Sequence, residues 1–234
     1  MIRQLIRARR KQILIDVGTQ KDFFLGGGSA CIRNHRRVLS NIRRVMAWTR
    51  ARNIRIISTC DVYLNNNGGS ATDYCLDGTD GQEKIRYTLL SNRMSFAADG
   101  STDLPIDVLR QYRQIILYKR CVDPFDEPRI ERLLSEVRAN EFVLIGASAE
   151  GAVKAMALGL LQRRKKVTVV VDAVGTSNTR QAALALRKMA AKGARLVETK
   201  TFAGKSHLRR IGICSCKACQ GRGGKPSAGF EGEN

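Results

Sequence analysis

The stretch FVLIGASAEGAV, residues 142–153, predicts a strand that passes directly into a helix. Its first part, Phe142–Gly146, is a continuous apolar run of the length of a strand that is buried on both faces. Small residues then lead into a helix predicted over Glu150–Arg163. A buried strand followed at once by a helix is the repeating unit of parallel α/β folds, so this stretch indicates the fold class.

The same alternation of strand and helix continues on both sides of this stretch. Apolar runs predict further strands at Gln12–Asp16, Arg55–Thr59, Ile115–Lys119 and Val167–Asp172, with an edge strand at Leu196–Thr199. Apolar residues at helical spacing predict helices over Arg36–Arg52, Glu127–Ala139 and Thr179–Lys192. We therefore expect a three-layer α/β/α domain with a mainly parallel central sheet of five or six strands.

The composition suggests how the chain is divided. Residues 1–11 form a basic N-terminal segment, residues 12–203 the α/β domain, and residues 204–234 a basic, Cys-containing tail that we expect to be mobile. Residues 61–83, rich in Gly, Asn, Ser and Asp, predict a functional or locally disordered loop. No apolar run approaches the roughly 18 residues of a membrane span, and the start lacks an apolar signal core. We expect a cytoplasmic protein without membrane contacts.

The net charge of +20 is concentrated in a few segments. Residues 33–55 contain eight arginines and no acid, among them Arg36, Arg37, Arg43 and Arg44; the tail adds Arg209 and Arg210. Such clusters attract polyanions, nucleic acid included, by releasing counterions. A basic surface that serves only solubility would have the same sequence pattern. Aromatic residues that could stack on bases are only 6% of the chain, so the prediction of a nucleic-acid partner rests on charge alone.

The seven cysteines do not form a disulfide pattern, because four of them are scattered along the chain. The remaining three, Cys214, Cys216 and Cys219, could bind zinc together with His207. The alternative is a flexible basic tail whose thiols are simply prone to oxidation. Apart from this zinc, the sequence predicts no cofactor.

Chemical side chains occur where predicted strands end, which is where parallel sheets bind ligands. Asp16 ends the first strand and Lys119 ends the Ile115–Lys119 strand. The two side chains could meet as an acid and an ammonium group in a pocket. They could equally belong to structural ion pairs.

Four short motifs follow one another in a characteristic order. They are Asp16, Gln20, Asp22 and Phe23; then Gly78, Thr79 and Gly81; then Lys119 and Phe125; and last Gly146 through Ala152-Val153. This succession resembles the isochorismatase-like hydrolases, the superfamily that includes nicotinamidases and N-carbamoyl amidohydrolases, over about residues 12–200.

The resemblance implies a set of roles. In that family an Asp takes the proton of a Cys thiol, a Lys stabilises the thiolate, and the Cys attacks a carbonyl. Carried over by motif, Asp16 is the acid and Lys119 the lysine, while Ala152 stands where the family has its Cys. The resemblance also implies a cis bond between Ala147 and Ser148, and an oxyanion hole formed by the N–H groups of Ser148 and Ala152.

Ala152 excludes covalent thiol catalysis at this position, because a methyl group is no nucleophile. We therefore expect a pseudoenzyme with a binding or assembly role, although a Cys replaced by design would read the same. One alternative is a hydrolase that acts without a covalent intermediate on an amide or vinyl ether, with Asp16 as proton donor. Another is a nucleic-acid-associated protein. Cys60 or Cys121 could replace the missing thiol, but a buried structural Cys is the more common case, so we favour this alternative less.

Some family members bind a metal through an Asp-x-His motif after the second strand. Here the stretch reads Asp61-Val62-Tyr63, and the only histidines are His35 and His207, so the resemblance predicts no metal at this position. A small-molecule ligand and a homo-oligomer remain open as partners.

Overall fold

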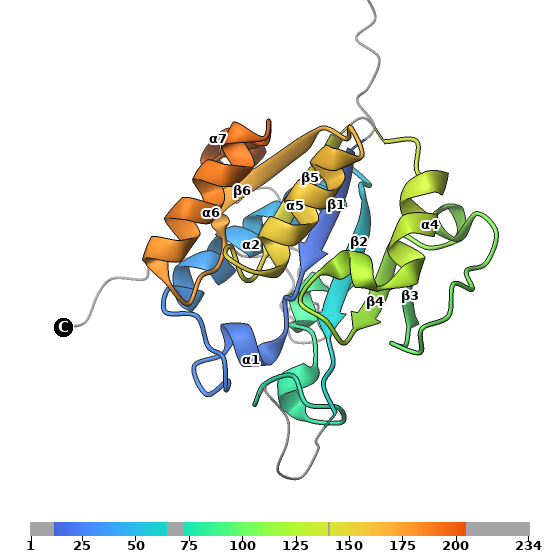
Figure 1. The fold of residues 1–234 in the computed structure, drawn as a ribbon, viewed down its shortest axis with the longest axis horizontal. Coiled ribbons are helices and arrows are strands. Elements are labelled where there is room, and N and C mark those ends of the chain that lie inside the picture. Colours follow the sequence, from blue (N-terminus) through green and yellow to red (C-terminus); the bar gives the residue numbers. More distant parts are fainter. Residues whose placement is uncertain (1–11, 65–72, 140, 205–234) are drawn as a thin grey trace, which may run out of the picture.

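The computed structural model describes residues 12–64, 73–139 and 141–204. Seven strands form one sheet in the order β3-β4-β2-β1-β5-β6-β7, and every ladder is parallel (Figure 1). The strands are β1 (Gln12–Val17), β2 (Arg55–Asp61), β3 (Arg93–Phe96), β4 (Gln114–Lys119), β5 (Glu141–Gly146), β6 (Val167–Val174) and β7 (Arg195–Val197). The first described strand, β1, lies in the middle of the sheet, and the later strands extend the sheet to both edges.

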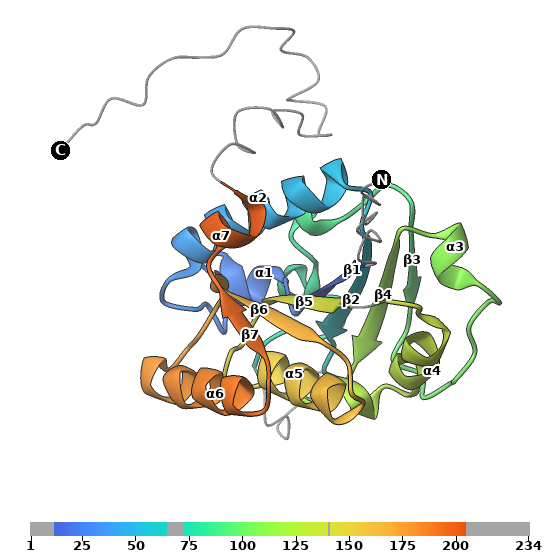
Figure 2. The same cartoon turned by 90° about the horizontal axis from the view of Figure 1, so that it is seen from above.

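Helices cover both faces of this sheet (Figure 2). One face carries α1 (Lys21–Phe24), α2 (His35–Ala51) and α7 (Thr199–Ala203), and the other carries α3 (Val108–Gln111), α4 (Pro128–Glu136), α5 (Ala152–Gln162) and α6 (Thr179–Ala191). Three short 3-10 turns complete the described elements: η1 (Asp80–Gln82), η2 (Arg86–Thr88) and η3 (Pro124–Asp126). The predicted three-layer α/β/α architecture is confirmed.

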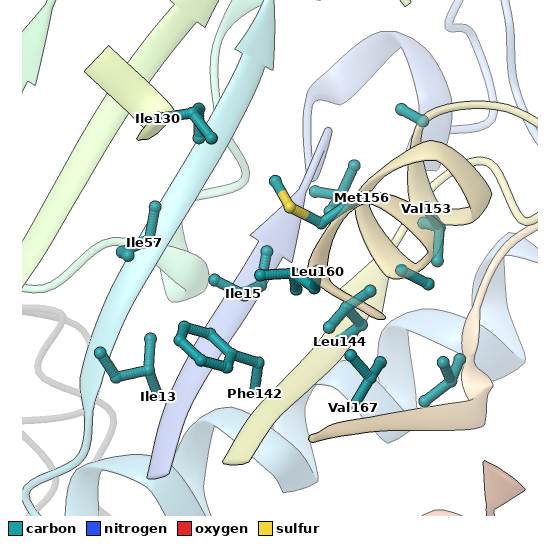
Figure 3. Close-up of a cluster of buried hydrophobic side chains, with 14 of the residues drawn as sticks. Ile13, Ile15, Ile57, Ile130, Phe142, Leu144, Val153, Met156, Leu160 and Val167 are labelled. Carbon is teal, nitrogen blue, oxygen red and sulfur yellow. The ribbon is translucent and has the colours of Figure 1, made fainter. Parts of the chain in front are cut away.

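Two apolar clusters, one on each face, hold the layers together. Figure 3 shows the cluster under α5, where Ile15 and Leu144 of the sheet meet Met156 and Leu160 of the helix. The cluster under α2 contains Leu14, Val143 and Ile145. Neighbouring residues of one strand thus face opposite helical layers, as the pleat of a strand requires. Because both faces are covered, the central strands are apolar throughout, which explains why the sequence predicts them well.

The predicted number of strands needs a correction. All six predicted strands occur, but β3 is a seventh, at the edge beyond β4. Its residues alternate between exposed and half-buried positions, so it lacks the apolar run of a central strand. The last predicted strand ends earlier than expected, because α7 begins at Thr199. None of the described helices is long and apolar enough to cross a membrane.

Candidate active site at the carboxyl ends of the strands

The junction between β5 and α5 is held closely against β1. Gly146 has a φ of +117°, the Ala147–Ser148 peptide bond is cis, and the Ala147 N–H donates to the Val17 carbonyl at 2.9 Å. Helix α5 begins at Ala152, which is only 6% exposed. The N–H groups of Ser148 and Ala152 donate no hydrogen bond to any residue that the structure describes. The start of α5 therefore offers two backbone donors and the positive end of a helix dipole.

Lys119 lies beside this helix start. Its side chain is 1% exposed and its Nζ donates to a carboxylate oxygen of Asp61, to the Cys121 carbonyl at 2.6 Å and to the Val122 carbonyl at 3.3 Å. Val122 in turn borders Gly151, since a methyl group on Gly151 would lie 3.6 Å from Val122 Cγ1. The ammonium group is thus close to the first turn of α5, but its donors are already used by these partners.

Asp16 has a different set of partners. Its Oδ2 accepts from Lys84 Nζ at 2.7 Å and from Ser58 Oγ at 3.1 Å, and Lys84 also donates to Thr19 Oγ1 at 2.6 Å. Asp16 is fully buried and the side chain of Lys84 is 2% exposed. Burial lowers the pKa of Lys84, but the negative charge of Asp16 and its hydrogen bond outweigh this, so the pKa stands above its ordinary value. Lys84 therefore stays protonated at neutral pH.

The register of the sheet places Asp16 and Lys119 on opposite faces. Asp16 pairs with Ser58 on β2, and Lys119 pairs with Asp61 on the same strand. Ser58 and Asp61 are three positions apart on β2, which corresponds to about 10 Å along the strand. Because successive side chains alternate between the two faces, an offset of three positions also places them on opposite faces of the sheet. Asp16 and Lys119, which the sequence suggested as an acid and ammonium pair, therefore do not pair with each other. Asp16 lies on the α2 side with Lys84, whereas Lys119 lies on the α5 side with Asp61.

The end of β1 therefore presents no carboxylate to the start of α5. The residue that follows β1 at the cis peptide is Gly18, with a φ of +54°. A methyl group there would already lie 3.0 Å from the Ala147 carbonyl oxygen. The groups around Ala152 include the backbone junction between β5 and α5, the Ser148 hydroxyl beside Gly151 and the Lys119–Asp61 ion pair.

The two substitute cysteines lie in different surroundings. Cys60 is fully buried in the middle of the two ion pairs, and burial raises its pKa to about 12. Cys121 is exposed, and Lys119 contacts its backbone carbonyl. Cys60 is thus a protonated core residue at neutral pH.

The donor set after β2 does not suit a divalent metal. Asp61 is taken by the ammonium group of Lys119, and Tyr63 stands where the family motif has a His. Burial is the main cause that raises the pKa of Tyr63 above its ordinary range, so its hydroxyl stays protonated. Within residues 12–64, 73–139 and 141–204, no three His, Cys, Asp or Glu side chains gather as metal ligands. His207, Cys214, Cys216 and Cys219 lie outside the described residues, and zinc there stays a prediction.

Gln20 and Asp22, which the family motif singled out, hold loops in place. The Gln20 amide accepts from the Asp61 N–H at 2.7 Å and donates to the carbonyls of Asp61 and Gln82 at 2.7 and 2.8 Å. Asp22 accepts from the Cys75 N–H at 2.6 Å. Both residues therefore fix the segment around Gly78–Gly81 against β1 and β2.

Lys84, the buried ion-pair partner of Asp16, could not be identified as a site residue from the sequence. It lies between Glu83 and Ile85 in a polar segment, where a lysine is normally solvated. Its only sequence signal is its position three residues after Gly81 of the Gly-Thr-x-Gly motif.

A hollow of about 840 Å³ lies at the other end of the sheet. It is lined by the amino ends of β1 and β2, including Gln12 and Arg55, together with Arg110 of α3 and residues 135–139. Parallel sheets bind ligands at their carboxyl ends, so this hollow is unrelated to the Lys119 site.

A fully parallel seven-stranded sheet between two helical layers, with α5 starting at the carboxyl end of β5, defines a three-layer α/β/α architecture. The chain matches the model of the isochorismatase domain over residues 12–201, and it belongs to that family. No curated protein matches the sequence.

Solved structures of the family share the fold at low sequence identity. Pyrazinamidase of Pyrococcus horikoshii in complex with zinc is 20% identical, with a TM-score of 0.64 over 80% of this chain and 99% of that one. N-carbamoylsarcosine amidase from Thermoplasma acidophilum is 19% identical, with a TM-score of 0.60 over 81% and 96%. A putative isochorismatase hydrolase from Oleispira antarctica is 12% identical, with a TM-score of 0.66 over 84% and 97%.

Proposed function

We propose that this protein is an isochorismatase-family domain without cysteine-hydrolase activity, which acts by binding rather than by turnover. The observation that carries the proposal is the set of chemical groups around Ala152, at the junction between β5 and α5. Ala152 supplies no nucleophile, and the carboxylate of Asp16 lies on the other face of the sheet. A thiol at position 152 would therefore not complete the family's machinery, because the motif carboxylate that deprotonates it lies on the other face and Asp61, on the α5 side, is held by Lys119.

The two ion pairs support the same proposal. Lys119 is neutralised by Asp61, and Asp16 by Lys84, each within a nearly fully buried contact. A lysine that stabilises a thiolate must turn its charge toward the sulfur, and an acid that donates a proton must face the substrate. Asp16 Oδ2 is instead held by Lys84 and Ser58 on the α2 side of the sheet, which also argues against a vinyl-ether hydrolase with Asp16 as acid.

A substrate panel tests this proposal. The full chain is incubated with nicotinamide, pyrazinamide, N-carbamoylsarcosine and isochorismate, and ammonia and products are measured against a blank and an active nicotinamidase. We expect no turnover above the blank. Turnover that disappears in folded Lys119→Met or Asp16→Asn variants would refute the proposal and establish the noncovalent hydrolase instead.

A further inference from the structure

The outer face of α2 is strongly basic. The helix has 17 residues without a single acid, and its buried side faces the sheet through Val38, Ile42 and Val45. The opposite side carries a stripe of arginines at helical spacing. With η2, which contacts α2, they form what we call the α2 arginine face: Arg36, Arg37, Arg43, Arg44 and Arg86.

Two of these arginines are held in place by their surroundings. The Arg43 guanidinium lies 4.7 Å from the centre of the Tyr87 ring, and an Arg44 Nη donates to the Gly204 carbonyl at 3.5 Å. A guanidinium that is oriented by such contacts loses less freedom when it binds a phosphate. Arg36, Arg37 and Arg86 are exposed and form no hydrogen bond or ion pair within the described residues.

Few acids oppose this charge. Glu198, before α7, is the acid whose charge interacts with Arg37, and it is itself paired with Lys200 at 2.7 Å. The hydrogen bond from Lys200 is the main reason that the pKa of Glu198 lies below its ordinary value. The five arginines therefore keep a net positive face.

The chemistry of the face favours nucleic acid over a membrane surface. The exposed large apolar side chains of the described chain are Leu25, Leu64, Ile106, Val122 and Leu184, and none of them lies on α2. A membrane-bound helix needs such side chains to insert among lipids. Arginines instead match phosphate oxygens with two parallel hydrogen bonds. A helix of this length, about 25 Å, spans about seven phosphates of one strand.

We propose that the α2 arginine face binds the phosphate backbone of nucleic acid. This inference is independent of the catalytic proposal, because the face lies on the layer opposite α5 (Figure 2). The geometry provides positive charge and groups that match phosphate oxygens, so binding is expected to be strongly salt-dependent.

Fluorescence anisotropy with a labelled 20-nucleotide RNA, and with DNA of the same sequence, measures this binding on the full chain. We expect the logarithm of affinity to fall with the logarithm of salt concentration with a slope of about −3 or steeper, as four or more phosphate contacts require. The combined Arg36→Gln, Arg37→Gln and Arg86→Gln variant should bind at least about tenfold more weakly, with a slope shallower by about 2.

The control removes the same charge from the other layer. Arg180, Arg187 and Lys192, all exposed in or next to α6, are changed to Gln together, and both variants are checked for an unchanged thermal midpoint. This control should shift affinity less than about threefold. Equal losses in the two variants, absence of salt-dependent binding, or binding to phosphatidylserine vesicles but not to nucleic acid would overturn the proposal.

Discussion

Replacing Gly146 by Ala is expected to prevent stable folding. A Cβ at this position would lie 1.7 Å from the Val17 carbonyl oxygen and 2.7 Å from the Val17 carbonyl carbon. Strand β1 cannot withdraw, because it is paired on both sides by β2 and β5. The cost should exceed about 4 kcal/mol, a large part of the total stability of a domain. Soluble yield and urea unfolding at 25 °C measure the effect.

Gly78 provides the matched control for this substitution. It also has a positive φ, +76°, but a Cβ there meets no atom within 4 Å. Gly78→Ala should therefore cost only the backbone strain of about 1–2 kcal/mol. If Gly146→Ala were no more destabilising than Gly78→Ala, this result would contradict the close contact between Gly146 and the Val17 carbonyl of β1.

Replacing Lys84 by Met should produce the second largest effect. The substitution leaves the fully buried carboxylate of Asp16 without its counter-charge, and breaking a buried ion pair from one side costs about 3–5 kcal/mol. Removing both charges should be much milder, so the Asp16→Asn, Lys84→Met double variant is expected to recover most of the loss. Urea unfolding of the two single variants and the double variant completes the thermodynamic cycle.

Lys21 is the control for this pair. It contacts Asp80 and Glu83 at the surface, where solvent screens the interaction, so Lys21→Met should change stability little. A Lys84→Met variant as stable as Lys21→Met would contradict the buried pair. A double variant no more stable than Lys84→Met would show that the loss has another cause.

The central strands could be predicted from the sequence because burial on both faces makes them apolar from end to end. Phe142–Gly146 and Val167–Asp172 are examples, and both occur as β5 and β6. Strand β3 could not be predicted in the same way, since only one side of its alternating residues is partly covered. The information that places it is its pairing with β4, a contact between distant segments.

The sequence indicates candidate site residues but not how they are arranged. Asp16 and Lys119 do lie in neighbouring regions of the sheet, but the face that each one occupies depends on the register of three strands. The sequence shows where a strand ends but not its register against β2. It therefore could not decide between one Asp16–Lys119 pair and two separate ion pairs, Asp16–Lys84 and Lys119–Asp61. Lys84, which pairs with Asp16, belongs to a loop without a periodic pattern of apolar residues.

Restoring the thiol tests the central claim most directly. The Ala152→Cys variant of the full chain is assayed for ammonia release from nicotinamide, pyrazinamide and N-carbamoylsarcosine, beside the unchanged protein. The introduced thiol would stand at the start of α5 near Lys119, whose ammonium group is already paired with Asp61, while the motif carboxylate of Asp16 lies on the other face of the sheet. We expect both proteins to remain at the level of the blank. Multiple turnovers by Ala152→Cys would contradict the account, because they would mean that only the nucleophile was missing.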